Sequence, residues 1–295
     1  MGRFFRFVWF LFRGLLSYAA SWRDSMAQAD NVFSGSIPEL YDRHLGPLLF
    51  EPYAEDLAAR VAALQPQKLL ELAAGTGIAT RALARALPGS AGIVATDLNE
   101  PMIAFAAART GADAKIVWRQ ADALQLPFDE ASFDLVVCQF GAMFFPDKTA
   151  AYRETHRVLK PGGHFLFSVW DRLAENELSD AINVAVAALF PQDPPRFIER
   201  TPFGYFDSAK IRSELRAAGF RDTKADVVAR RSRAASLREV VVGLCQGSPL
   251  RNEIEARDPA GLGRVTEAVT AALAQRFGSG PLDAGMQAIV FTAAR

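Results

Sequence analysis

The sequence has no excess of charge of either sign. Its 295 residues include 33 Lys and Arg and 33 Asp and Glu, so the formal net charge at pH 7 is zero. A neutral chain lacks the general electrostatic attraction to a polyanion that basic nucleic-acid-binding proteins have. We therefore expect no nucleic acid partner.

Cysteine and histidine are also scarce. Two cysteines, Cys138 and Cys245, are too few for the disulfide framework of a small secreted domain or for a cysteine-based zinc site. The three histidines, His44, His156 and His164, do not have the spacing of metal ligands. We predict no metal site, and we expect a cytoplasmic protein.

The N-terminal region lacks an apolar run long enough to span a membrane. The run at residues 7–12 is far shorter than the about 20 residues that a bilayer requires. Residues 1–22 are nevertheless rich in Phe, Trp and Leu with interspersed Arg, so two interpretations stay open. In one, residues 1–30 are an extension that the domain does not need, and translation begins at Met26. In the other, residues 1–22 contact a membrane surface or act as a signal.

Apolar segments and helical patterns alternate through the middle of the chain. Half of the residues are hydrophobic, which is enough for a sizeable core. Strict alternation of strands and helices predicts an α/β fold, with a parallel sheet and helices on both of its faces. We expect strands at residues 68–72, 92–96, 116–119, 133–139 and 164–170, and helices at residues 55–64, 78–87, 101–108 and 149–158.

The turn between the first expected strand and its helix consists of small residues only. Residues 73–77 read Ala-Ala-Gly-Thr-Gly, and side chains of this size allow a ligand to lie against the backbone. The helix that begins at residue 78 offers free N–H groups and the positive end of its dipole. This arrangement predicts a ligand site at the turn.

Two carboxylates and one missing glycine define the ligand further. Glu71 lies just before the turn, and Asp97 ends the next strand about 20 residues after Gly77, the spacing that places a carboxylate on a ribose diol. A dinucleotide-binding turn would have its third glycine at position 80, where this chain has Thr80. We therefore expect a nucleoside ligand without a pyrophosphate.

Five sequence blocks, in the correct order, resemble the class I S-adenosylmethionine-dependent methyltransferases. The most similar branch is the small-molecule type that includes the ubiquinone and menaquinone biosynthesis methyltransferases, and the resemblance extends over residues 30–230. One departure is that the usual first glycine of the loop is Ala73 here. The five blocks are residues 71–77, 96–102, 122–128, 133–137 and 157–163.

The resemblance implies S-adenosyl-L-methionine as the cofactor and assigns residues to its parts. The loop backbone approaches the cofactor closely, Glu71 lies near the methionine amino group, and Asp97 accepts from the ribose hydroxyls. Asp122 accepts from the adenine amino group, although a carboxylate that caps its own loop is the alternative. The implied cofactor-binding residues are Tyr41, Glu71, Ala73, Gly75, Gly77, Asp97, Leu98, Met102, Asp122, Ala123, Gln139 and Phe140.

The resemblance also implies the complete sheet. We expect a Rossmann-like, doubly wound sheet of seven mostly parallel strands with the last strand antiparallel, in a single domain at residues 31–295 with a cofactor-binding core at residues 66–175. Strands six and seven would lie at residues 223–229 and 288–293. Helical segments at residues 178–220 and 236–280 would then cover the substrate pocket.

The sequence shows no catalytic triad. Methyl transfer from a sulfonium depends on position more than on acid or base, which suits this absence. Candidates for a direct role are His44, which could assist deprotonation, and Trp170 at the end of the fifth strand, but both residues also suit a structural role. The acceptor would be a small organic molecule; its accepting atom and the oligomeric state stay open.

Three functions are compatible with these patterns. The first is methyl transfer to a small acceptor by in-line displacement, with release of S-adenosylhomocysteine. The second is an NAD-dependent oxidoreductase, which Glu71 and Thr80 disfavour. The third is a non-catalytic protein that binds S-adenosylmethionine, which the sequence does not exclude because this chemistry requires no particular catalytic side chain.

Overall fold

The structure is a computed structural model that describes residues 30, 33, 35–111, 113 and 115–295. The expectations for residues 1–29, including the membrane contact of residues 1–22 and the start at Met26, lie outside the described residues. Within the described part of the chain, we find no helix with the length and hydrophobicity that crossing a bilayer requires.

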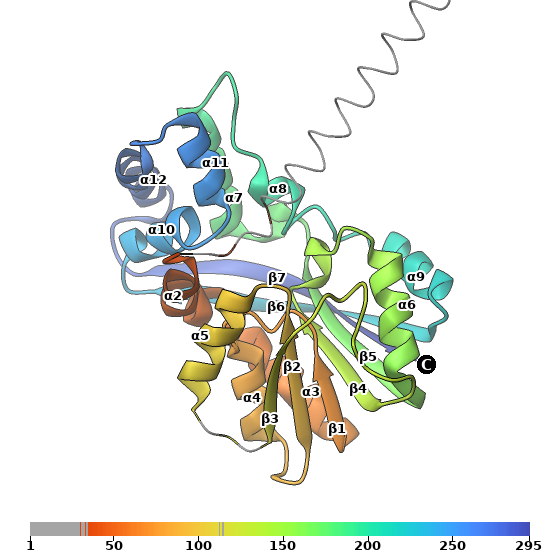
Figure 1. Ribbon diagram of the computed structural model, residues 1–295. Coiled ribbons are helices and arrows are strands. Elements are labelled where there is room, and N and C mark those ends of the chain that lie inside the picture. Colours follow the sequence, from red (N-terminus) through yellow and green to blue (C-terminus); the bar gives the residue numbers. More distant parts are fainter. Residues whose placement is uncertain (1–29, 31–32, 34, 112, 114) are drawn as a thin grey trace, which may run out of the picture.

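A seven-stranded sheet forms the centre of the molecule (Figure 1). The strand order is β3-β2-β1-β4-β5-β7-β6; the first five strands in the chain run parallel, and β7 runs antiparallel to both β5 and β6. This topology confirms the predicted doubly wound sheet. The strands are β1 (Lys68–Glu71), β2 (Gly92–Asp97), β3 (Ile116–Gln120), β4 (Phe133–Gln139), β5 (Leu159–Trp170), β6 (Arg221–Ala234) and β7 (Leu282–Ala294).

Three strands are longer than the apolar pattern predicts. β5 begins at Leu159 instead of residue 164, because residues 159–163 continue the strand through a Pro-Gly-Gly segment. β6 and β7 pair with each other along almost their whole length, yet most of β6 is exposed and polar. Backbone pairing defines these strand ends, and hydrophobicity therefore does not reveal them.

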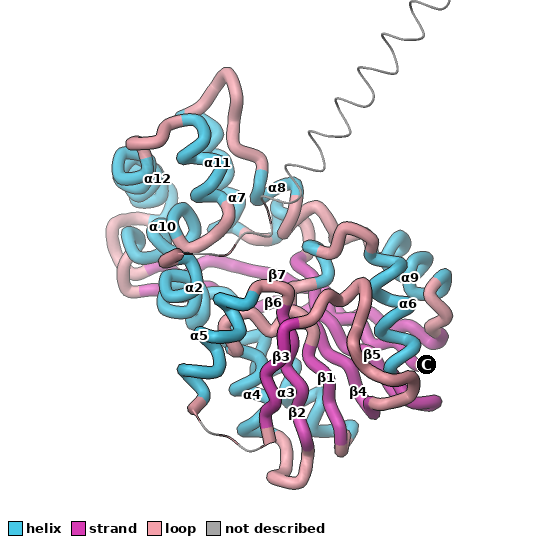
Figure 2. Tube along the Cα trace, viewed as in Figure 1, coloured by secondary structure: helices cyan, strands magenta, loops and turns pink. Residues whose placement is uncertain are grey.

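Helices cover both faces of the sheet, as the cyan and magenta layers of Figure 2 show. Side chains of α3 (Glu51–Leu64) and α4 (Ile78–Ala86) pack on one face, where Leu57 and Leu83 are buried against Leu69. On the opposite face, α6 (Lys148–Val158) and α9 (Ser208–Ala217) pack over the aromatic side chains of β5. A further helix, α5 (Glu100–Thr110), lies against β3 and β2.

A second group of helices gathers beside the sheet, at the upper left of Figure 1. The segment between β6 and β7 forms α10 (Leu237–Gln246), α11 (Leu250–Arg257) and α12 (Leu262–Phe277), and α7 (Glu177–Leu189) packs against α12. The short helix α8 (Phe197–Arg200) contacts α11, and α10 packs on η1 (Tyr41–Phe50), which continues from α2 (Ile37–Leu40). The sequence pattern did not indicate α11, because only Leu250 and Ile254 of this polar helix are buried.

Candidate active site

The turn after β1 has the backbone conformation that its small residues suggest. Ala73, Gly75 and Gly77 have φ angles of 52°, 56° and 80°, in the left-handed region. A Cβ atom on Gly77 would lie 2.8 Å from the Trp118 ring, so this position requires glycine. Ala73 occupies the position where the methyltransferases that the sequence resembles usually have glycine. Its positive φ angle shows that alanine preserves the turn.

Asp97 connects this turn to the end of β2. Its Oδ2 atom accepts a hydrogen bond of 2.8 Å from the Gly75 N–H, and its Oδ1 atom accepts one of 2.8 Å from the Asn99 N–H. Burial raises the pKa of the Asp97 carboxyl, and these backbone donors oppose the rise. The glycine-containing turn and the Asp97 carboxylate are thus in direct contact.

A cavity with an empty volume of about 820 Å³ opens above the turn. All the residues predicted to bind the cofactor line this cavity except Glu71 and Gly77. Lining residues that the sequence did not indicate are Phe33, Thr96, Asn99, Ala121, Leu124, Gly141, Phe144, Phe145 and Pro146. Many of these residues lie in turns, which have no regular hydrophobic periodicity. Only their position next to a sequence motif could have identified them.

The two exceptions lie behind the turn. Glu71 is only 1% exposed, and its Oε2 atom is buried without a hydrogen-bond partner. Burial raises the pKa of Glu71 to about 8, and the charge of Asp97 adds to the effect. Gly77 forms the N-cap of α4 and packs against the Trp118 ring.

A second cavity, with an empty volume of about 590 Å³, adjoins the first. Phe33, Tyr41, Phe140 and Phe144 line both. The other described lining residues include no charged side chain: they are Leu45, Leu49, Phe50, Trp170, Ser179, Phe197, Ile198, Pro202, Phe203, Leu244, Ser248 and Pro249. These residues come from η1, from the end of β5, from α7, α8 and α10, and from the loops beside these helices, which are far apart in the sequence.

Aromatic rings form the boundary between the two cavities. Phe140 stacks on Trp170 with ring centroids 3.9 Å apart, and Tyr41 stacks on Phe50 at 4.9 Å. Phe140 has a φ angle of 53°, a strained conformation for a bulky residue and one that is typical of functional sites. Gly141 follows with no room for a side chain, since its Cβ would lie 2.4 Å from the Ala73 Cβ.

Tyr41 and Gln139 supply polar groups near this boundary. Burial raises the pKa of the Tyr41 hydroxyl, and the carboxylates of Asp97 and Asp42 raise it further, so the hydroxyl stays neutral. The Gln139 side-chain amide donates to the Phe50 carbonyl at 2.8 Å, whereas its Oε1 atom is buried without a partner. Hydrogen-bonding capacity thus remains beside the aromatic rings.

Asp42 connects η1, above the first cavity, to the neighbouring helices α4 and α5. Its carboxylate is almost completely buried and pairs with Arg81 of α4 at 2.9 Å and with Arg109 of α5 at 3.0 Å. A buried carboxylate requires such partners. The two ion pairs therefore hold Tyr41, the preceding residue, at the cavity wall.

The two candidates for a direct catalytic role lie in different surroundings. Trp170 is 4% exposed and lines the second cavity. His44 lines neither cavity; it lies on η1 so close to Gly243 of α10 that a Cβ on that glycine would be 2.8 Å from the His44 Cβ. Burial lowers the pKa of His44, and the charge of Arg43 lowers it further.

Comparison with known proteins places this chain among methyltransferases. Residues 70–167 match a family model described as "Methyltransferase domain". A demethylmenaquinone methyltransferase of Clavibacter sepedonicus is 30% identical over 169 residues, which are 54% of this chain and 68% of the relative. A demethylmenaquinone methyltransferase of Staphylococcus epidermidis is 33% identical over 139 residues, which are 46% of this chain and 57% of the relative. The chain thus spans little more than half the length of the Staphylococcus relative.

Similar solved structures share the fold at low sequence identity. The YcgJ protein of Bacillus subtilis has a TM-score of 0.54 at 17% identity, with 83% of this chain and 98% of that chain covered. The [4+2]-cyclase SpnF has a TM-score of 0.53 at 18% identity, with 83% and 81% covered. Because a protein named as a cyclase has this fold, the fold alone does not establish methyl transfer.

Proposed function

This chain belongs to the class I S-adenosylmethionine-dependent methyltransferases, and we propose that it transfers the methyl group to a small apolar acceptor. The cofactor of the family is S-adenosyl-L-methionine. The observation that carries the proposal is the pair of adjoining cavities. One presents the carboxylates and backbone groups that a nucleoside requires, and the other is apolar, with aromatic rings between them.

The residues of the first cavity suit the cofactor. Asp97 uses part of its acceptor capacity on two backbone donors and retains lone pairs for the ribose hydroxyls. One oxygen of Asp122 accepts from the Leu124 N–H at 2.9 Å, which leaves the other for an exocyclic amine. Glu71 lies behind the turn with its Oε2 atom buried and does not line this cavity, so its contact with the cofactor's ammonium group stays a prediction.

The cofactor, when bound, supplies an electrophilic methyl group: an electron pair of the acceptor forms the new bond to carbon, and the electrons of the broken C–S bond neutralise the sulfonium, which gives S-adenosylhomocysteine. A neutral acceptor that carries a proton on the accepting atom loses it to solvent. The contribution of the chain is position. Phe140 and Tyr41 form the shared wall, so they orient the two reactants and exclude water. Alignment of this kind is worth about 7–11 kcal/mol of the barrier.

The second cavity favours an uncharged, apolar acceptor. Its described lining residues carry no charge, and transfer of an unpaired ion into such surroundings is costly. Demethylmenaquinone, after which the curated relatives are named, is an apolar acceptor of this kind. The acceptor itself is part of the proposal, because the matched region covers only part of those relatives.

Calorimetry and a turnover assay test the proposal. We expect the protein to bind S-adenosylmethionine and S-adenosylhomocysteine, and to release S-adenosylhomocysteine when a panel of quinols and apolar phenols is added. Tighter binding of NAD than of S-adenosylmethionine would indicate the oxidoreductase alternative. Cofactor binding without turnover on any acceptor would favour the non-catalytic alternative.

A further inference from the structure

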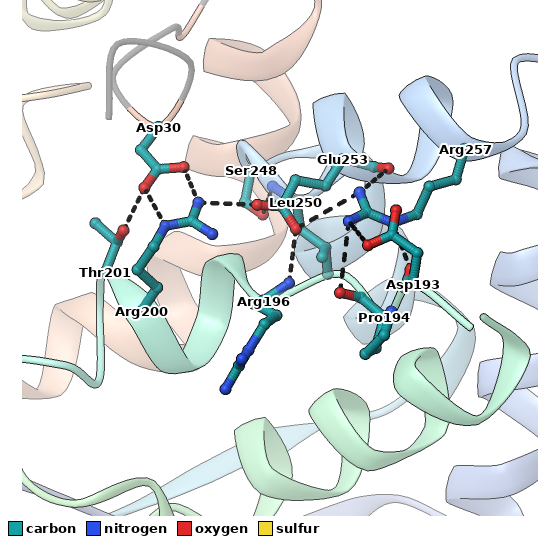
Figure 3. Close-up of polar contacts among 10 residues, drawn as sticks. All are labelled: Asp30, Asp193, Pro194, Arg196, Arg200, Thr201, Ser248, Leu250, Glu253 and Arg257. Atoms are coloured by element: carbon teal, nitrogen blue, oxygen red, sulfur yellow. Dashed lines mark hydrogen bonds and ion pairs between the residues drawn. The ribbon is translucent and has the colours of Figure 1, made fainter. Parts of the chain in front are cut away.

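A charged cluster joins three segments of the chain (Figure 3), and none of its members lines the apolar cavity. We name it the Arg200 cluster; it consists of Asp30, Arg200, Thr201 and Glu253. Arg200 Nη2 lies 2.5 Å from Asp30 Oδ1 and 2.8 Å from Glu253 Oε1, and the Thr201 hydroxyl donates to Asp30. One guanidinium thus connects α8 with α11 and with Asp30, which precedes α2.

Both carboxylates of the Arg200 cluster are largely removed from solvent. The side chain of Asp30 is 8% exposed and that of Glu253 is 12% exposed, whereas Arg200 is 32% exposed. Carboxylates buried to this degree require a charged partner, and a shared guanidinium supplies it for both. Removal of one member therefore leaves a buried charge with weaker compensation.

Glu253 extends the connection to the loop before α8. Its Oε2 atom accepts from the Arg196 N–H at 2.7 Å, and Arg257, on the next turn of α11, donates to the Asp193 carbonyl at 2.6 Å (Figure 3). The helix α11 is therefore fixed to the loop and to α8 at several points. These contacts join a part of segment 178–220 to a part of segment 236–280.

The same elements form part of the wall of the apolar cavity. Phe197 and Ile198 of α8 line it, and so do Ser248 and Pro249 just before α11. Phe33, three positions after Asp30, lines both cavities. The positions of these lining residues thus depend on the contacts of the Arg200 cluster.

We propose that the Arg200 cluster determines acceptor specificity, because it fixes the distance between the two helical segments and with it the size of the apolar cavity. This inference depends on the proposed function of that cavity as the acceptor site. The cluster members are positioning residues: they do not line the apolar cavity, and they act through the lining residues of α8, of the chain before α11 and of Phe33.

Two neutral apolar probes of different size test the inference on the full-length protein with saturating S-adenosylhomocysteine. N-phenyl-1-naphthylamine is followed by its fluorescence, and the smaller naphthalene by its displacement of that probe. The measured quantity is the dissociation constant of the larger probe divided by that of the smaller probe. We expect Glu253→Gln to lower this ratio by about fivefold to tenfold, because a looser cavity discriminates less against the larger probe. Arg200→Lys, which keeps the charge but loses the planar fork, should change the ratio in the same direction.

The matched control is Glu267→Gln. Glu267 of α12 forms an exposed ion pair with Arg238 in the same helical group, and neither residue lines the apolar cavity, so its replacement should leave the ratio unchanged. An unchanged ratio in both cluster variants, or an equal loss of affinity for the two probes, would overturn the inference. A wild-type protein that binds S-adenosylhomocysteine but neither probe would overturn it too, whereas one that binds no S-adenosylhomocysteine would refute the proposed function as well.

Discussion

Asp97 connects two backbone segments that line the first cavity. Its carboxylate holds Gly75 of the turn and Asn99 before α5 at the same time, so it shapes the cavity and also faces the position proposed for the ribose. A single short side chain can perform both tasks because a carboxylate has acceptor capacity for about four hydrogen bonds.

Replacement of Asp97 by Asn should weaken cofactor binding. The amide keeps the shape of the side chain but loses the charge and one acceptor, which should cost about 1–3 kcal/mol of binding free energy. Titration calorimetry with S-adenosylhomocysteine measures this loss, and thermal unfolding of the ligand-free variant provides the control. Affinity equal to that of the wild type would contradict the proposed contact with the ribose.

Glu71 should make stability depend on pH in an unusual direction. Burial raises the pKa of Glu71 to about 8 in the folded chain, above its ordinary value of 4.5, so the folded state retains a proton that the unfolded state has lost. The free energy of unfolding should therefore fall as the pH rises from about 5 to 8, by at most about 1.4 kcal/mol per pH unit.

The variant Glu71→Gln isolates this effect. Gln stays neutral at every pH, so the difference in stability between wild type and variant should change across this window and level off above it. Urea unfolding at several pH values measures the difference. A constant difference from pH 5 to pH 8 would show that Glu71 does not retain its proton in the folded chain.

At the scale of elements, the sequence predicted best what is buried and regular. The strand β4 has the predicted bounds, since it combines a clear apolar pattern with a distinct end. The extra length of β6 and β7 results from backbone pairing, and α11 is too short and polar to produce a signal. The turn at residues 73–77 was predictable because its chemistry is local. The sequence predicted that segments 178–220 and 236–280 cover a substrate pocket, but not which of their residues line the apolar cavity, because its walls come from distant segments.

The helix η1 illustrates how one element positions a site residue. It carries Tyr41 on the cavity side and is fixed to α4 and α5 through the ion pairs of Asp42. These pairs span three helices, so their loss should affect the cavity wall as well as the stability of the fold.

Asp42→Asn should lower the free energy of unfolding by about 2 kcal/mol and also weaken S-adenosylhomocysteine binding. The matched control is Asp56→Asn: Asp56 of α3 likewise pairs with two arginines, Arg60 and Arg230, but lines neither cavity. We expect this control to lose stability and keep its affinity. If both variants keep their affinity, the ion pairs of Asp42 do not position Tyr41 for binding.

At the scale of the whole molecule, different strands of the sheet support the two cavities. The parallel strands β1, β2 and β4 end in the turns that line the first cavity. Beyond β5, the antiparallel pair β6 and β7 carries the long helical segment that contributes to the second cavity. The two cavities meet at a shared aromatic wall, so we expect ligands in them to influence each other.

Binding in the two cavities should therefore be coupled. A ligand in the first cavity fixes Phe33, Tyr41, Phe140 and Phe144, and an apolar ligand then meets a wall that is already ordered. We expect saturating S-adenosylhomocysteine to tighten N-phenyl-1-naphthylamine binding by about fivefold or more, and the probe to tighten S-adenosylhomocysteine binding by the same factor, because coupling free energies are reciprocal. Fluorescence titration measures the first effect and calorimetry the second. Two affinities that do not depend on the other ligand would show that the shared wall is rigid before either ligand binds.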